Sequence, residues 1–292
     1  MGNSQAPLLL SRSFAVRLLR CYEYPDPRRP GKVIRGYDRT HALRTARLCG
    51  AVALSLGYGR EIVRQYQIAC LLHDLGRAGL DRHLFGRLWS WAQRRDIPTR
   101  PREWRARYPR TAYGSETEAF IARFGREIER DGIAMDAWAR EQIEMRLGYE
   151  RRLARRLRAV KPSLVRLGVR WKPWMQRIML YYYYPERLNG APRWVKQLAE
   201  VLVACEQFEA YSNRQRGRDY YGRRSESLEE AFRYLDKLRA EGILSAPVLS
   251  SLKQLAAAGA FDDLLASVRG TGLTLRERRF LRRLAQEVSA CP

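Results

Sequence analysis

Hydrophobic residues recur at helical spacing along most of this chain, and no stretch sustains the alternation typical of a half-buried strand. Leu48, Val52 and Leu56 repeat at every fourth position and stop at the sequence GYG, which predicts a helix that ends in a turn. Capping-box patterns predict the starts of three further helices, at 115–118, 227–230 and 274–277. We therefore expect an all-α fold.

Three segments rich in Arg, Pro, Gly or Asn interrupt the helical pattern and are expected to be loops, at 92–114, 185–193 and 212–226. The sequence contains no internal repeat and no low-complexity linker, and 292 residues fit one large domain or two small ones. We predict one helical domain with short flanking helices: an N-terminal helix in 1–29, the domain over 30–255, and a helical tail, 256–292, packed on it.

The net charge of +24 comes from 49 arginines and 6 lysines against 31 acidic residues. Arginine binds phosphate and carboxylate groups through planar, bidentate hydrogen bonds, so a polyanionic partner such as nucleic acid is one interpretation. The other is a solvated surface of arginine-biased composition, because the arginines are spread along the whole chain. The sequence leaves both interpretations open.

The five cysteines are scattered, odd in number and form no Cys-x-x-Cys pair, so we expect reduced thiols in a cytoplasmic protein. With 46% hydrophobic residues, the composition is typical of globular proteins. The longest apolar runs fall far short of the about 20 residues that a membrane-spanning helix needs, so we predict no membrane association. Nothing in the sequence indicates an oligomeric state.

The chain has three histidines, and this scarcity makes their positions informative. His73 and Asp74 directly follow four apolar residues, 69–72, and His73 falls on the apolar stripe of the helix expected there. A protein core excludes such a pair unless hydrogen bonds or a metal satisfy it. His41 opens the preceding expected helix, so a turn at 57–59 brings it level with the pair.

Glu206 is the best candidate for a further ligand, because it stands between the apolar run VLVAC and Phe208, where a carboxylate is costly unless it is paired or coordinated. Imidazole and carboxylate together suit Fe, Mn, Zn or Co, and also Mg if water completes its shell. The alternative is a His-Asp helix cap that binds no metal. His83 follows charged residues, so we expect it at the surface or beside a ligand.

In their order, these residues resemble the HD superfamily of metal-dependent phosphohydrolases, whose signature is a histidine, a His-Asp pair and an aspartate on separate helices. The resemblance covers residues 30–255 and is closest to the HD-GYP branch, which hydrolyses cyclic dinucleotides. It rests mainly on four stretches: THALRTARLCGAVALSLG, QIACLLHDLGRAGLD, YYPERLNGAP and VLVACEQFEAYSN. It implies an all-α HD-domain helical bundle with extra C-terminal helices.

The chain departs from the HD-GYP pattern at several positions. Arg77 replaces a lysine after the pair, Gly148 stands where the branch has a histidine, and Glu206 replaces the final aspartate. The double histidine of the GYP loop falls at Tyr184 and Pro185, and the loop lacks its Gly-Tyr. The resemblance therefore implies a reduced, mononuclear site for one divalent metal ion, with these ligands: His41, His73, Asp74 and Glu206.

The resemblance also implies a phosphohydrolase or phosphodiesterase that acts on a nucleotide, a cyclic dinucleotide or another phosphoester. Asp74 and Arg77 are the catalytic candidates, because Asp74 would orient or deprotonate a bound water and Arg77 would hold a phosphate oxygen. Arg187 and Asn189 would line the substrate mouth. The alternative is a degenerate HD-GYP-like module, with or without a metal, that binds an anionic ligand, nucleic acid or a protein partner and does not cut.

Overall fold

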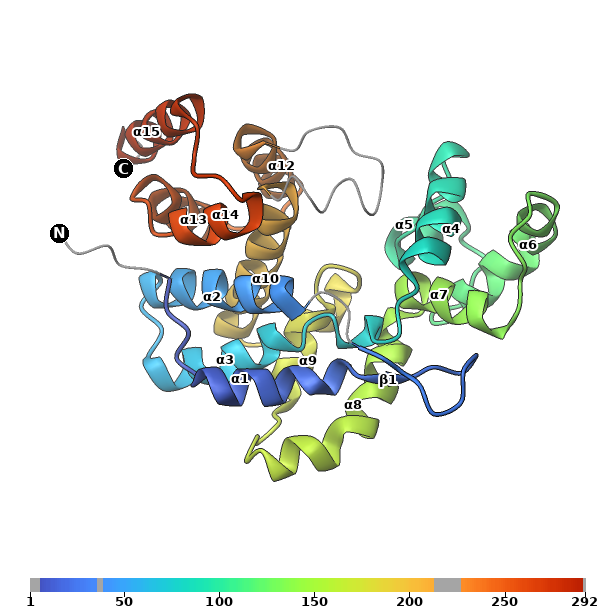
Figure 1. The fold of residues 1–292 in the computed structure, drawn as a ribbon. Helices are drawn as coiled ribbons and strands as arrows, with labels where there is room; N and C mark the ends of the chain where they lie inside the picture. Colours follow the sequence, from blue (N-terminus) through green and yellow to red (C-terminus); the bar gives the residue numbers. More distant parts are fainter. Residues whose placement is uncertain (1–5, 36–38, 213–226, 291–292) are drawn as a thin grey trace.

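The computed structural model describes residues 6–35, 39–212 and 227–290, and they form an all-α fold (Figure 1), as predicted. Within these residues the only sheet is a short antiparallel pair, β1 (Tyr24–Pro25) and β2 (Val33–Ile34), in which Tyr24 lies opposite Ile34. No helix in the same ranges is both long enough and apolar enough to cross a lipid bilayer.

The helices fall into three groups along the chain. The first group is α1 (Arg12–Leu19), η1 (Arg20–Tyr22), α2 (Arg39–Ser55), α3 (Arg60–Leu71) and η2 (Leu75–Arg77). The second group is α4 (Arg82–Arg94), α5 (Pro101–Arg107), α6 (Glu116–Arg130) and α7 (Ala137–Leu147). The third group is α8 (Tyr149–Arg166), α9 (Pro173–Leu180), η3 (Pro185–Leu188), α10 (Arg193–Ser212), α12 (Leu228–Ala240), α13 (Ala246–Ala257), α14 (Asp262–Arg269) and α15 (Leu275–Ala290).

Helices α2 and α3 form a hairpin, and α10 packs against α2. The hairpin turns at 57–59 as the sequence predicts, and Gly57 there takes φ of 85°, a conformation that glycine adopts without steric cost. Tyr66 of α3 is fully buried and donates a hydrogen bond of 2.7 Å to the Leu198 carbonyl of α10. This packing brings the start of α2, the end of α3 and the middle of α10 together.

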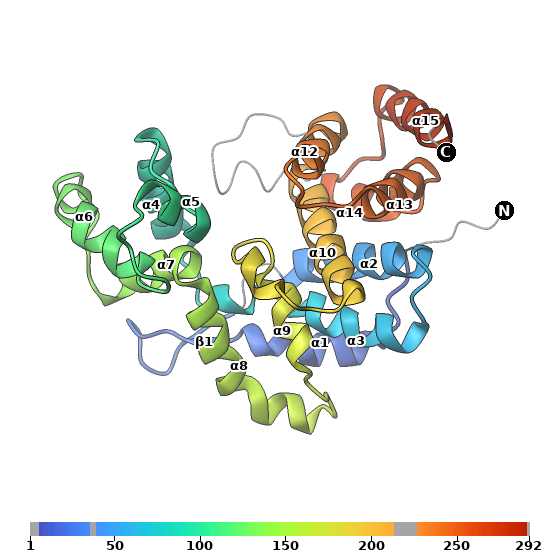
Figure 2. The same ribbon diagram turned by 180° about the vertical axis from the view of Figure 1, so that it is seen from behind.

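Residues 80–147 form a separate lobe with a hydrophobic core of its own, seen at the right of Figure 1 and at the left of Figure 2. Aromatic rings dominate this core, and the rings of Trp89 and Trp104 each lie 5.7 Å from that of Phe120. A larger core draws its residues from 6–75 and 149–284 and includes α1 and the C-terminal helices α13–α15. The segment 30–255 therefore contains residues of two cores, and the predicted tail shares the larger one.

The prediction of a loop over 92–114 is wrong, because this segment contains the end of α4 and all of α5. Pro101 opens α5, a position where its missing N–H costs no hydrogen bond, and Arg100 before it is extended. The segment 185–193 begins with the 3₁₀ helix η3. Residues 213–226 of the third expected loop lie outside the described residues.

Helices begin at all three predicted capping sites, but only two of the three caps form. Ser227 and Glu230 make the reciprocal capping box with bonds of 3.2 and 3.0 Å, and Thr274 and Glu277 do so at 3.2 and 2.9 Å. The Ser115 side chain makes no capping bond, although α6 begins directly after it. A capping pattern therefore predicts where these helices start, while the cap bond itself depends on local geometry.

Candidate metal centre

His41, His73 and Glu206 come together from three different helical segments. His41 lies in the first turn of α2, His73 lies just beyond the end of α3, and Glu206 lies in α10. One ligand atom from each residue lies within 4.8 Å of the other two, and the two imidazole rings meet edge to face at 5.1 Å. The structure therefore brings together three of the four residues that the sequence predicts as metal ligands.

The buried His41 ring is oriented by a carboxylate that the sequence prediction missed. Its Nδ1 lies 2.5 Å from Oε2 of Glu209, one turn beyond Glu206 on α10. A carboxylate can only accept here, so the Nδ1–H donates and the lone pair resides on Nε2. Arg44 donates to the other oxygen of Glu209 from two nitrogens, at 2.8 and 2.5 Å. Such carboxylate–histidine pairs are typical of metal-ligating histidines.

The His73 ring has an equivalent anchor from the backbone. Its Nδ1 donates to the Cys70 carbonyl at 2.7 Å, one of the carbonyls that the end of α3 leaves without a helical partner. This bond again leaves the lone pair on Nε2. Nε2 is buried and makes no hydrogen bond within the described part of the chain. An imidazole nitrogen in this state is costly to bury unless something else, such as a metal ion, binds it.

Glu206 brings a carboxylate to the cluster that has no partner within the described part of the chain. Among residues 6–35, 39–212 and 227–290, its carboxylate makes no hydrogen bond and no ion pair, and the residue is half-buried. By contrast, Glu209 on the same helix is engaged by both His41 and Arg44. The two carboxylates of α10 therefore have different surroundings, and only Glu206 offers its oxygens to the cluster.

Asp74 is adjacent to the cluster, but its carboxylate is turned toward Arg77. The Arg77 guanidinium lies 3.2 Å from the Asp74 carboxylate and also donates to the Tyr183 hydroxyl. One Asp74 oxygen lies 3.8 Å from Nε2 of His73. Asp74 is not among the three residues whose ligand atoms are mutually close, so its predicted role as a ligand stays a prediction.

The turn that carries His73 and Asp74 is held by two buried tyrosines. The Tyr22 hydroxyl donates to the Leu71 carbonyl at 3.0 Å and accepts from the Asp74 N–H at 3.2 Å. The Tyr149 hydroxyl donates to the His73 carbonyl. Burial, reinforced by the nearby Asp74 carboxylate, holds the pKa of both tyrosines well above the usual value, so both stay neutral donors.

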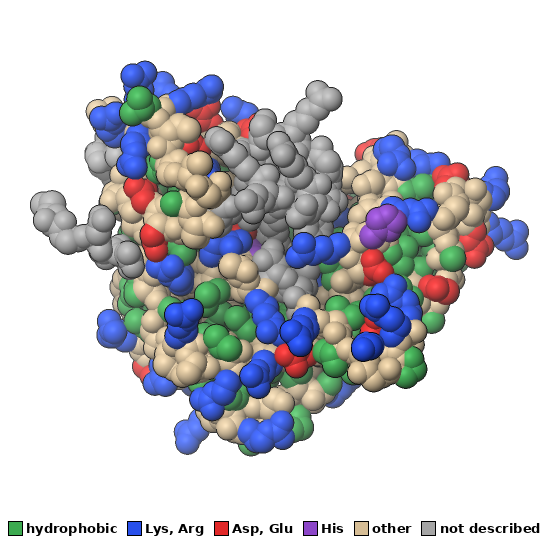
Figure 3. Space-filling model, in the orientation of Figure 1, with side chains coloured by type: hydrophobic (Ala, Val, Ile, Leu, Met, Phe, Trp, Pro, Cys, Tyr) green, Lys and Arg blue, Asp and Glu red, His purple; other side chains and the backbone are tan. Residues whose placement is uncertain are grey.

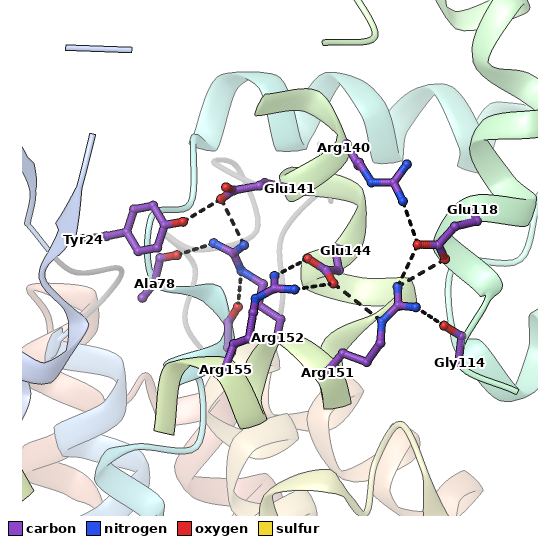
Figure 4. A network of polar contacts seen from close by, with 11 residues as sticks. Tyr24, Ala78, Gly114, Glu118, Arg140, Glu141, Glu144, Arg151, Arg152 and Arg155 are labelled. Atoms are coloured by element: carbon purple, nitrogen blue, oxygen red, sulfur yellow. Dashed lines mark hydrogen bonds and ion pairs between the residues drawn. The ribbon is translucent and has the colours of Figure 1, made fainter. Parts of the chain in front are cut away.

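Arg152 of α8 fixes the other end of this turn (Figure 4). Its guanidinium donates to the carbonyls of Gly76 and Ala78, each at 2.8 Å, and pairs with Glu141 of α7 at 3.0 Å. Glu141 also accepts from the Tyr24 hydroxyl. With 1% of its surface exposed, Arg152 is among the most buried cations of the described chain. Arg152 thereby connects the His73–Asp74 turn to α7 of the lobe formed by residues 80–147.

Further ion pairs in Figure 4 link α6, α7 and α8. Glu144 of α7 is bound by Arg155 at 2.5 Å and approached by Arg151 at 3.6 Å. Glu118 of α6 is bound by Arg140 at 2.7 Å and by Arg151 at 3.2 Å. These arginines are considerably more exposed than Arg152, so solvent screens their pairs.

Two of the predicted substrate-binding residues, Arg187 and Asn189, lie on the surface, whereas Arg77 is buried. Arg187 pairs with Glu150 at 2.7 Å and stacks over the Tyr113 ring at 5.1 Å. Asn189 is exposed at the end of η3, so both roles stay predictions. At Gly148 an added Cβ would lie 2.5 Å from Glu144, so the structure has no room there for the histidine of the HD-GYP branch. His83 is exposed on α4.

No protein-family model, no curated protein and no solved structure matches this chain. The chemistry of the site therefore rests on its own donor set. Two imidazoles whose Nδ1 atoms bond to acceptors of the protein, together with one carboxylate, fit a divalent transition metal such as Fe, Mn or Zn, with further positions left for water or substrate. The buried Nε2 of His73, which has no described hydrogen-bond partner, is the atom that fits this interpretation best.

Proposed function

We propose that this chain is an HD-type, metal-dependent phosphohydrolase and that His41, His73 and Glu206 hold one divalent metal ion. The observation that carries the proposal is that three ligand atoms lie within 4.8 Å of one another. They come from residues 32 to 165 positions apart, in a sequence with only three histidines. Both histidines donate from Nδ1 to an acceptor within the protein, so Nε2 is the atom that would bind the metal. The predicted order of histidine, His-Asp pair and acid is consistent with this class.

A bound divalent ion would lower the pKa of a coordinated water and polarise a phosphoryl oxygen. The chain's own residues would then orient the reactants. Asp74 lies beside the cluster and can accept a proton from the attacking water, while Arg77 adds positive charge and guanidinium donors for a phosphate oxygen. For the substrate we propose a phosphoester, such as a nucleotide or a cyclic dinucleotide.

A second candidate function is an HD-type module that binds an anionic ligand, nucleic acid or a protein partner without hydrolysing it. The ion pair between Asp74 and Arg77 favours this candidate, because it occupies the carboxylate that a metal or a water would otherwise use. The two functions predict different behaviour once metal is supplied. Only the hydrolase releases product.

Hydrolysis of p-nitrophenyl phosphate and bis-p-nitrophenyl phosphate, with Mn²⁺, Fe²⁺ or Zn²⁺ added, tests the proposal. We expect metal-dependent turnover by the native chain. His73→Ala should lower it by more than about 100-fold, because even changes in outer-shell partners cost 10- to 100-fold. His83→Ala is the matched control, since His83 is exposed and outside the cluster, and should retain activity. Metal-loaded protein without turnover on either probe would contradict the hydrolase and leave the binding module.

A further inference from the structure

A groove of about 1100 Å³ lies between α12 and α15, over α13, and away from the metal centre. Two acidic side chains line it, and each already has a cationic partner within the groove. Glu229 is bound by Arg276 at 3.0 Å, and Asp236 is bound by Lys253 at 2.8 Å. The acidic residues of the lining are therefore neutralised locally.

Among the described residues, no acidic side chain pairs with four arginines of the lining: Arg233, Arg279, Arg282 and Arg283. Within the described residues, their guanidinium groups make no hydrogen bond and no ion pair. Arg233 projects from α12 and the other three from α15, so the charge lies on both walls. Figure 3 shows Lys and Arg side chains gathered over α15 at the upper left. Four arginines without a partner among the described residues therefore lie together in one concave place.

We propose that this groove binds single-stranded nucleic acid. A volume near 1100 Å³ with cations on both walls suits an extended chain of anions better than a single phosphate. Arginine matches phosphate oxygens through its planar fork, and a concave groove follows a single strand, whereas a duplex is read by convex elements that enter its grooves. The partly exposed Phe280 in the lining offers an apolar face for a base. This proposal is independent of the metal centre.

Fluorescence anisotropy with a labelled oligothymidylate of about 15 nucleotides, a length within the usual site sizes for single strands, measures the binding. The test variant is R279E/R282E/R283E. The matched control is R64E/R126E/R158E, which makes the same charge change at exposed arginines of α3, α6 and α8. We expect the groove variant to bind about 100-fold more weakly at 0.1 M salt and to lower the salt slope by about 2, the effect of three lost phosphate contacts at about 0.7 each. The control should stay within a few-fold of the native chain.

A second variant, R279Q/R282Q/R283Q, removes the guanidinium groups without adding acids and should weaken binding in the same direction. Circular dichroism melting of each variant checks that the fold is retained. Three results would overturn the proposal: no binding of the oligonucleotide by the native chain, equal losses in the groove variant and the control, or retained binding in both groove variants. Binding of an acidic peptide or of anionic phospholipid vesicles in place of the oligonucleotide would also overturn it.

Discussion

Arginines near the metal centre and arginines on α15 belong to the same residue type but have opposite surroundings. Arg44, Arg77 and Arg152 are buried, and each donates to identified acceptors around the His73–Asp74 turn or Glu209. Arg279 and Arg282 are exposed, and within the described residues they have no acceptor at all. The buried group donates hydrogen bonds to acceptors inside the protein. The exposed group keeps its N–H donors available for a binding partner.

This contrast shows that the arginines behind the net charge of +24 have two different roles. A buried guanidinium that satisfies backbone carbonyls and carboxylates contributes to structure, since its removal leaves those acceptors unsatisfied. An exposed, unpaired guanidinium contributes little to stability and much to the local potential. The following predictions test the two roles, beginning with the largest expected effect.

Arg152→Ala should destabilise the protein by about 3 kcal/mol, because it leaves the carbonyls of Gly76 and Ala78 without their side-chain donor and removes the cationic partner of Glu141. Urea denaturation followed by circular dichroism measures this. Arg155→Ala is the matched control, since Arg155 lies on the same helix, pairs with Glu144 and has a side chain that is 51% exposed. It should cost about 0.5 kcal/mol. Equal costs for the two would contradict the distinction between buried and exposed arginines.

Glu209→Gln should lower the affinity for a divalent metal by about 10- to 100-fold, because the neutral amide anchors the His41 ring and the Arg44 guanidinium more weakly. Competition with a chelating indicator dye measures the affinity. Glu200→Gln is the control on the same helix, because Glu200 binds Ser245 away from the cluster. An unchanged affinity in Glu209→Gln would mean that Glu209 has no part in holding the metal ligand.

Tyr22→Phe should destabilise the protein by about 1 kcal/mol, the usual net value of a lost hydrogen bond. The hydroxyl it removes bridges the Leu71 carbonyl and the Asp74 N–H in the interior. The ring itself stays, so the core keeps its volume. Urea denaturation gives the difference, and a value near zero would show that the buried turn does not depend on this bridge.

Arg282→Ala should change the free energy of unfolding by less than about 0.5 kcal/mol, as surface substitutions without defined contacts usually do. Arg282 is exposed and lines the groove between α12 and α15. The same denaturation experiment measures the change. A loss of 2 kcal/mol or more, typical of a residue with structural contacts, would place Arg282 with the buried arginines and remove it from the proposed binding surface.

Local sequence signals predict the part of the site that helices determine. Helical periodicity and the GYG turn predict the hairpin of α2 and α3. In this hairpin the start of α2 lies beside the end of α3, which places His41 next to His73. Glu206 stands out because a carboxylate interrupts an apolar run. Glu209 lies three residues after Glu206 on the same helical face, and this spacing could have predicted it as part of the site. Its partner His41, however, is 168 residues away in the sequence.

The rest of the site depends on contacts that no local pattern encodes. Arg152 reaches the carbonyls of Gly76 and Ala78 only because α8 packs along the turn. Asp74 looks like a ligand in the sequence, yet its carboxylate faces Arg77, because two adjacent side chains after a helix end point in different directions. The sequence of α5 is rich in arginine and has no helical hydrophobic pattern, so the helix was not predicted. Only Pro101 indicates where it starts.

The most direct test of the central claim is the metal content of the untagged protein, measured by plasma mass spectrometry after exposure to Fe²⁺, Mn²⁺ or Zn²⁺ and removal of the excess. We expect close to one ion per chain in the native protein and in His83→Ala. We expect almost none in His73→Ala and in Glu206→Ala, because each removes one of the three clustered ligands. A native chain that retains no metal, or a metal content that the two ligand substitutions leave unchanged, would contradict the metal centre.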